Sequence, residues 1–117
     1  MISDRSVDLG RLVGQSDEYQ ALKRANDRLM EENALRSALE RLRTLQMGVA
    51  EQLDRGVEPT LDQQKEIDTL VGQVQSHATY QGVVAAQANF DKLMMKVNEW
   101  ILDGIKQGAQ SRIITLG

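Results

Sequence analysis

The sequence predicts an all-α fold, an elongated antiparallel bundle of about four to five helices that is dominated by two long helices. Three observations support this prediction. Apolar residues recur at spacings of three and four along most of the 117 residues, the chain has one proline, and only 3% of its residues are aromatic. A sheet-based fold would normally use more aromatic and β-branched residues.

Two helices are predicted near the start of the chain, with a short turn between them. The first covers residues 7–13 and ends before Gly14. Ser16 then suits an N-cap, and Asp17 and Glu18 follow in the first turn, where the helix dipole favours acidic side chains. The apolar stripe of this second helix consists of Tyr19, Leu22, Ala25 or Asn26, and Leu29.

Local signals leave open whether residues 16–55 form one helix or two. No glycine or proline interrupts the stretch around Glu32 and Asn33. These two residues are nevertheless its weakest point, because Asn33 can cap a new helix. The apolar stripe that follows consists of Leu35, Leu39, Leu42, Leu45 or Gln46, Val49 and Leu53.

The clearest helix start in the chain follows its single proline. Gly56 suits the position just after a helix, and Pro59 restricts Glu58 to an extended conformation. Thr60 and Gln63 have the spacing of a capping box. The stripe of this fourth helix consists of Leu61, Ile67, Leu70, Val71 and Val74.

The last helix is the longest that the sequence predicts. It begins at Ser76 or His77 and ends near Lys106, before Gly108. Some 30 residues at a rise of about 1.5 Å each give a rod about 45 Å long.

The whole chain, residues 1–117, is predicted to form one domain, with a helical bundle over 7–106 and a tail over 107–117. The final segment, 112–117, is rich in branched apolar residues. We expect it to dock as an extended strap on its own bundle or on a neighbour. The alternative is a frayed tail, as is common at chain ends.

The apolar stripes supply candidates for a core or for an interface between chains. Leu39, Leu42 and Leu45 are expected to pack against the last helix. Their expected partners there are Phe90, Leu93 and Val97. The candidates together are Leu39, Leu42, Leu45, Val49, Phe90, Leu93, Met94, Val97, Trp100 and Ile101.

A bundle of such long, thin helices has a poor surface-to-volume ratio for 117 residues. Met94 and Met95 are adjacent, hence about 100° apart around the helix, and cannot both fully face one neighbour. Leu102 also lies off the main seam. We therefore predict a homodimer or a larger assembly, formed mainly by apolar burial.

The charge balance argues against general binding to nucleic acid or to anionic membranes, because the net charge is -3. A local group of basic residues is the exception. It could meet an acidic partner or RNA phosphates, or it could simply be a solvated face. This polar partner-surface candidate consists of Lys23, Arg24, Arg28, Arg36, Arg41 and Arg43.

The sequence gives little support for catalysis or for a bound cofactor. His77 is the only histidine, and it lies at a helix start, where a solvated or capping role is typical. The chain has no cysteine, and no glycine-rich nucleotide motif occurs. We predict no enzymatic activity, no cofactor, no metal and no small-molecule substrate.

The sequence also gives no sign of membrane association. No apolar run approaches the roughly 18 residues that a membrane span needs. The first ten residues lack the basic and apolar blocks of a signal peptide. We expect a cytoplasmic protein.

The order of three short patterns resembles that of the YlbF/YmcA family of bacterial helical regulators. The first pattern is Ser16, Tyr19, Lys23 and Ala25, the second is Leu45–Gln46, and the third is Ala86, Gln87 and Leu93. The resemblance covers about residues 7–106. The sequence departs from the family where a proline often follows the second helix, here Asn33, and where Asn-Pro often precedes the last helix, here His77–Ala78.

The resemblance implies a non-enzymatic protein that forms homo- or hetero-oligomers and acts as an accessory factor in competence, biofilm, sporulation or messenger-RNA processing control. It therefore adds another helical regulatory protein as a second expected partner. Some relatives hold iron–sulfur clusters through cysteines, which this chain lacks. The leading hypothesis is therefore an oligomeric interaction and regulatory protein. An RNA-binding accessory that uses the basic residues is the alternative, and an enzyme is a distant third.

Overall fold

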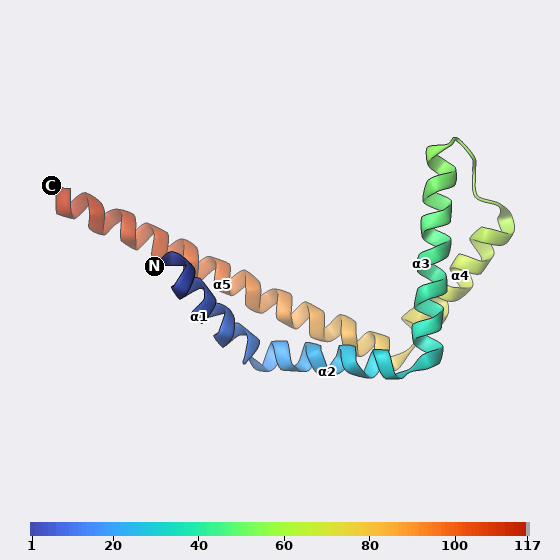
Figure 1. Ribbon diagram of the computed structural model, residues 1–117, viewed down its shortest axis with the longest axis horizontal. Coiled ribbons are helices and arrows are strands. Elements are labelled where there is room, and N and C mark those ends of the chain that lie inside the picture. The colour runs from blue at the N-terminus through green and yellow to red at the C-terminus, as the bar shows by residue number, and fades with distance from the viewer. Residues whose placement is uncertain (117) are drawn as a thin grey trace.

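The computed structural model describes the backbone of residues 1–116 and the side chains of residues 1–110. Its helices are α1 (Ile2–Gly14), α2 (Asp17–Glu31), α3 (Asn33–Asp54), α4 (Leu61–Gln75) and α5 (Ala78–Leu116). No strand occurs within residues 1–116. The predicted all-α class is confirmed, and so is the elongated shape, since the principal extents are 70 × 37 × 21 Å (Figure 1).

The helices form two antiparallel pairs that meet at an elbow (Figure 1). In the first pair, α2 packs along the first part of α5, and we call this pair the long arm. In the second pair, α3 packs against α4, and we call this pair the short arm. The two arms join where α2 passes into α3 and α4 passes into α5.

The chain breaks between α2 and α3, so residues 16–55 contain two helices. Glu32 is the residue at the break, with φ -90° and ψ 97°, an extended conformation. Asn33 is already helical, so the break lies one residue earlier than an Asn33 cap would place it. The extended residue redirects the chain, and α3 leaves the long arm at an angle (Figure 1).

The prediction that Leu39, Leu42 and Leu45 pack against the last helix around Phe90, Leu93 and Val97 is wrong. Within residues 1–116, no Cα atom of α3 lies within 8 Å of one in α5. The physical reason is the turn at Glu32, which carries α3 away from α5 and towards α4. Side chains of Leu39 and Leu42 instead line a hollow with residues of α4 and the first turn of α5, namely Val71, Val74 and Tyr80.

The place expected for that stripe along the last helix is taken by α2. Phe90 of α5 packs against Tyr19 of α2, with ring centroids 5.6 Å apart and planes inclined at 60°. Such a tilted arrangement is favourable for two aromatic rings. Leu22 of α2 is buried in the same arm, as are Ala86 and Val97 of α5.

The caps predicted at Ser16, Gly56 and Thr60 are confirmed. The Ser16 hydroxyl accepts a hydrogen bond from the backbone N–H of Tyr19 at 3.2 Å. Thr60 and Gln63 form both hydrogen bonds of a capping box, at 2.9 and 3.1 Å. Gly56 has φ +76°, a left-handed conformation that glycine adopts without a steric penalty.

Two predicted helix ends differ from the structure. The first helix begins at Ile2 instead of residue 7. The last helix continues past Gly108 to Leu116, so an extended strap over 112–117 is wrong for the backbone described. A single helical glycine costs only about 1 kcal/mol, which does not end a long helix. Docking of this tail concerns side chains that lie outside the described residues.

The core of the molecule is small. The buried apolar residues are Leu22, Leu35, Val74, Ala86 and Val97. The accessible surface is 9212 Å², whereas a compact monomer of this mass exposes about 6400 Å². The radius of gyration is 21.7 Å, against about 13 Å for a compact domain. The fold therefore exposes roughly 2800 Å² more than a globular chain of this size would.

Candidate interaction surfaces

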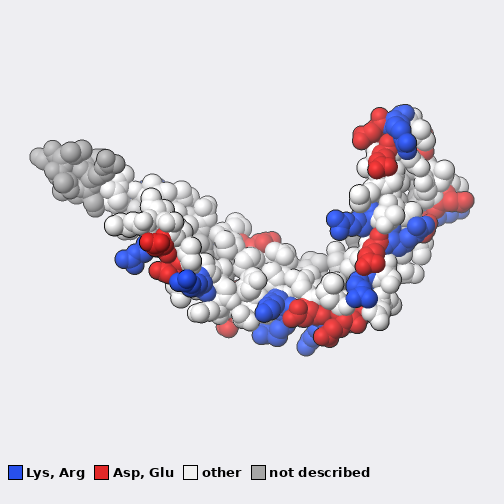
Figure 2. All heavy atoms as spheres, viewed as in Figure 1, with Lys and Arg blue, Asp and Glu red and all other residues white. Residues whose placement is uncertain are grey.

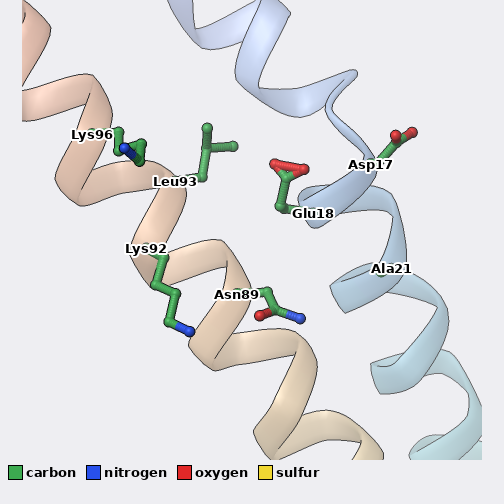
Figure 3. A pocket seen from close by; sticks show the side chains of 7 residues that line it. All are labelled: Asp17, Glu18, Ala21, Asn89, Lys92, Leu93 and Lys96. Carbon is green, nitrogen blue, oxygen red and sulfur yellow. The ribbon is translucent and has the colours of Figure 1, made fainter.

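The excess surface is rich in large apolar side chains. On α5 they are concentrated in the half beyond Met94, where Trp100, Ile101 and Ile105 are 59%, 47% and 60% exposed. The cause is a difference in length, because α2 has 15 residues and α5 has 39. The first turn of α2 lies opposite Leu93 and Lys96 of α5, so α2 leaves the rest of α5 uncovered (Figure 3).

The structure divides the predicted core or interface candidates into three groups. Val97 is buried. Met94, Trp100 and Ile101 are exposed. The remaining candidates are partly buried, namely Leu39, Leu42, Leu45, Val49, Phe90 and Leu93.

Helix α1 extends the apolar surface at the same end of the molecule. Its side chains Ile2 and Leu9 line a hollow together with Ile101 of α5. The backbones of α1 and α5 stay apart, with no Cα pair within 8 Å in the described chain. Ile2, Val7 and Leu12 are exposed. The far end of the long arm is therefore apolar on two helices and unfilled between them.

The basic residues predicted as a polar partner surface do not act as one group. Arg36 donates hydrogen bonds to the backbone carbonyl of Met30 at 3.2 Å and to the amide oxygen of Asn33 at 3.0 Å. It therefore bridges the break between α2 and α3. The remaining members with no ion pair among the described residues are Lys23, Arg24 and Arg28 on α2 and Arg43 on α3.

Arg41, another member of that set, is occupied within the short arm. Its guanidinium donates to both carboxylate oxygens of Glu66, at 2.8 and 3.3 Å, and so ties α3 to α4. The side-chain hydrogen bond to Glu66 and the negative charge of that carboxylate raise the pKa of Arg41. Figure 2 shows basic and acidic side chains interspersed along both arms. The visible surface has no continuous basic face of the kind that RNA phosphates favour.

A polar cluster holds the elbow together. The Glu32 carboxylate lies 2.9 Å from His77 Nε2, within ion-pair distance, and accepts a hydrogen bond from the Thr79 hydroxyl. His77 Nδ1 accepts the backbone N–H of Thr79 at 3.2 Å. Because Nδ1 is the acceptor, the ring proton lies on Nε2, and a neutral imidazole satisfies both contacts.

The elbow cluster confirms the capping role predicted for His77, at the first turn of α5. Sequence reasoning did not identify Glu32 as its partner. The two residues are far apart in the sequence, and they meet only because the break in the α2–α3 helix stands beside the start of α5. The signal available in the sequence was a polar residue, Glu32, at a predicted helix break.

The hollow in Figure 3 lies between the start of α2 and the middle of α5. Asp17 and Glu18 stand in the first turn of α2, where the helix dipole stabilises carboxylates. Lys92 and Lys96 lie one turn apart on α5. The residues that line it are Asp17, Glu18, Ala21, Asn89, Lys92, Leu93 and Lys96. This set contains two carboxylates and two lysines but no histidine, serine or cysteine.

Metal and membrane features were sought in the described part of the chain. It has no group of three or more histidine, aspartate or glutamate residues placed to hold a metal ion. No described helix combines the length and the apolar character that crossing a bilayer requires.

Comparison with known proteins supports the resemblance noted in the sequence. Residues 2–106 match the family described as "Control of competence regulator ComK, YlbF/YmcA". No similar protein was found among curated sequences, and no similar fold among solved structures. The match spans most of the 117 residues and includes all three patterns from Ser16 to Leu93. The chain therefore belongs to the YlbF/YmcA family of competence regulators.

Proposed function

We propose that this protein is a non-enzymatic regulator that acts by binding other protein chains, both copies of itself and a second helical regulatory protein. The observation that carries the proposal is the surface of 9212 Å², which exceeds by roughly 2800 Å² that of a compact monomer. Burying this surface between chains supplies the apolar stabilisation that the small internal core lacks.

The distribution of apolar residues supports binding over catalysis. Exposed apolar patches of this extent are typical of protein–protein interaction sites. An active site would instead join a concave pocket to a few convergent polar groups. The polar cluster at the elbow consists of Glu32, His77 and Thr79, whose hydrogen bonds are made to one another. Its contacts support a structural role at the junction of the arms.

Membership of the YlbF/YmcA family supports a regulatory role, because the family is described by its control of the competence regulator ComK. We propose that the protein exerts a comparable control in a complex with another helical protein. Its target need not be ComK itself, and the competence, biofilm, sporulation and RNA-processing roles of relatives are the processes to test first.

Affinity purification of the full chain from native cells, followed by mass spectrometry, tests the regulatory part. We expect a second helical protein to be recovered in near-stoichiometric amount. Light scattering of the purified chain at micromolar concentration tests the oligomeric part, with an expected mass of at least twice 13.1 kDa. A monomeric mass together with recovery of the protein alone would refute the proposal.

A further inference from the structure

Helix α5 carries an exposed strip of mainly apolar residues beside the arc that faces α2. Projected at about 100° per residue, the exposed apolar residues of α5 other than Trp100 fall within an arc of about 120°. The residues that face α2 occupy the neighbouring arc, centred on Ala86, Phe90, Leu93 and Val97. We define the outer strip as Val84, Met94, Met95, Ile101, Leu102 and Ile105, which are 41–65% exposed.

The two edges of the outer strip differ in character. One edge carries Met94 and Ile101, which are apolar. The other edge is bordered by Lys92 and Glu99, which are charged and of opposite sign. In each edge pair the residues are seven apart, close to two full helical turns. The strip therefore has the layout of one coiled-coil face, with one apolar and one charged flank.

From this layout we infer that the outer strip of α5 is the surface through which two copies of the chain associate, with the two α5 helices antiparallel. This inference rests on the oligomeric part of the proposed function and specifies its geometry. A two-fold axis perpendicular to the helices brings each edge against the same edge of the other copy. A parallel pair would instead place the charged edge against Met94 and Ile101.

The charged edge is complementary to itself only in the antiparallel arrangement. With the two-fold axis near the level of Lys96 and Val97, Lys92 meets Glu99 of the second copy, and Glu99 meets its Lys92. The same register sets Met94 beside Ile101 of the second copy. A surface with its own complement built in favours a second copy over an unrelated partner.

Polar residues within the strip add a constraint on register. Asp91 and Asn98 lie inside the arc, and Asp91 already accepts a hydrogen bond from Gln87 Nε2 at 2.9 Å. Isolated polar residues at seam positions of paired helices select one register at some cost in stability. The strip therefore favours one alignment of the two helices.

The available area is sufficient for a stable dimer. A standard interface buries about 800 Å² on each partner. The excess surface of roughly 2800 Å² is more than three times that amount. The chain as a whole therefore exposes enough surface for a dimer and for a further contact through the short arm, where Met47 is exposed.

Light scattering and sedimentation of the full chain test this inference with the double substitution Met95→Glu/Leu102→Glu. We expect the dimer dissociation constant to rise at least tenfold. Met47→Glu/Leu53→Glu is the matched control, because these α3 residues are similarly exposed at 58% and 56%. The control should keep the wild-type mass. Circular dichroism confirms that both variants remain helical.

A charge exchange provides a second test that leaves the apolar content unchanged. Lys92→Glu and Glu99→Lys should each weaken the dimer several-fold, and Lys92→Glu/Glu99→Lys together should restore it. A wild-type oligomer that neither substitution set weakens would overturn the outer strip while leaving the proposed function intact. An equal loss in the strip and control variants would also overturn it. A monomeric wild type would refute both the outer strip and the oligomeric part of the proposed function.

Discussion

The two arms of the molecule differ in how much of the longer helix is covered by the shorter helix of the same pair. In the short arm, α3 has 22 residues and α4 has 15, and a turn with Gly56 and a capping box joins them. In the long arm, α2 has 15 residues and α5 has 39, so α2 covers only part of α5. The difference in length between the two helices of a pair therefore sets how much of their surface remains exposed for partners.

The arms also differ in what holds them. The long arm relies on apolar contacts, including the Tyr19–Phe90 ring pair. The short arm adds a bidentate ion pair between Arg41 and Glu66 across its two helices. The elbow between the arms relies on hydrogen bonds to the Glu32 carboxylate. Substitutions in each place should therefore differ in the size and the salt dependence of their effects.

The largest loss of stability should come from the buried leucine at the start of the short arm. Leu35 is only 3% exposed, and we expect Leu35→Ala to lower the free energy of unfolding by about 2–5 kcal/mol through lost burial and a cavity. Urea unfolding at fixed protein concentration measures this loss. Leu53→Ala, in the same helix but 56% exposed, is the control and should cost far less.

Leu42 provides a second test within α3, by comparison with Leu35. It is only partly buried, beside Val71 and Tyr80, so Leu42→Ala should cost less than Leu35→Ala. A Leu42→Ala loss equal to that of Leu35→Ala would mean that a second chain buries this face of the short arm in solution.

The next effect should come from the elbow. Glu32→Ala removes the acceptor for both His77 and Thr79, and we expect a loss of about 1–3 kcal/mol because these polar groups lose their partner. Thermal unfolding followed by circular dichroism measures the loss. Glu31→Ala, one residue earlier and exposed, is the matched control. Equal melting temperatures for the two variants would show that the cluster does not stabilise the elbow.

Features encoded within a few residues were predictable from the sequence. The Ser16 cap, the Thr60–Gln63 box and the Gly56 turn each depend on side chains or backbone within one turn of helix. The family, and with it a non-globular helical chain, also followed from short patterns. The exposed position of Trp100 and Ile101 was anticipated only as one of two options, core or interface.

The pairing of the helices was not predictable, because it depends on the direction of the chain at one residue. An apolar stripe such as Leu39, Leu42 and Leu45 shows that α3 needs a partner without specifying which helix that is. Glu32 adopts φ -90° and ψ 97°. Because the chain turns at this single extended residue, α3 packs against α4, and α2 packs against α5. A sequence with two comparable helical stripes does not distinguish between these pairings.

A smaller effect should come from the turn that closes the short arm. Gly56 has φ +76°, where any residue with a Cβ is strained, although no atom lies within 4 Å of a Cβ built there. Gly56→Ala should therefore destabilise the chain by about 1 kcal/mol through backbone strain alone. Gly48→Ala is the control, since that glycine is helical with the same open space. It should be neutral or stabilising.

The smallest effect should come from the exposed ion pair between Arg41 and Glu66. Its side chains are 54% and 42% exposed, so water and salt weaken the attraction even with two hydrogen bonds. A double-mutant cycle with Arg41→Ala and Glu66→Ala should give a coupling smaller than the loss at the elbow. The coupling should fall further between 0.05 and 0.5 M salt, because the screening length shortens about threefold over that range. A coupling that exceeds the elbow loss and resists salt would mean that the pair is buried in the assembled protein, which would place the short arm at an interface as well.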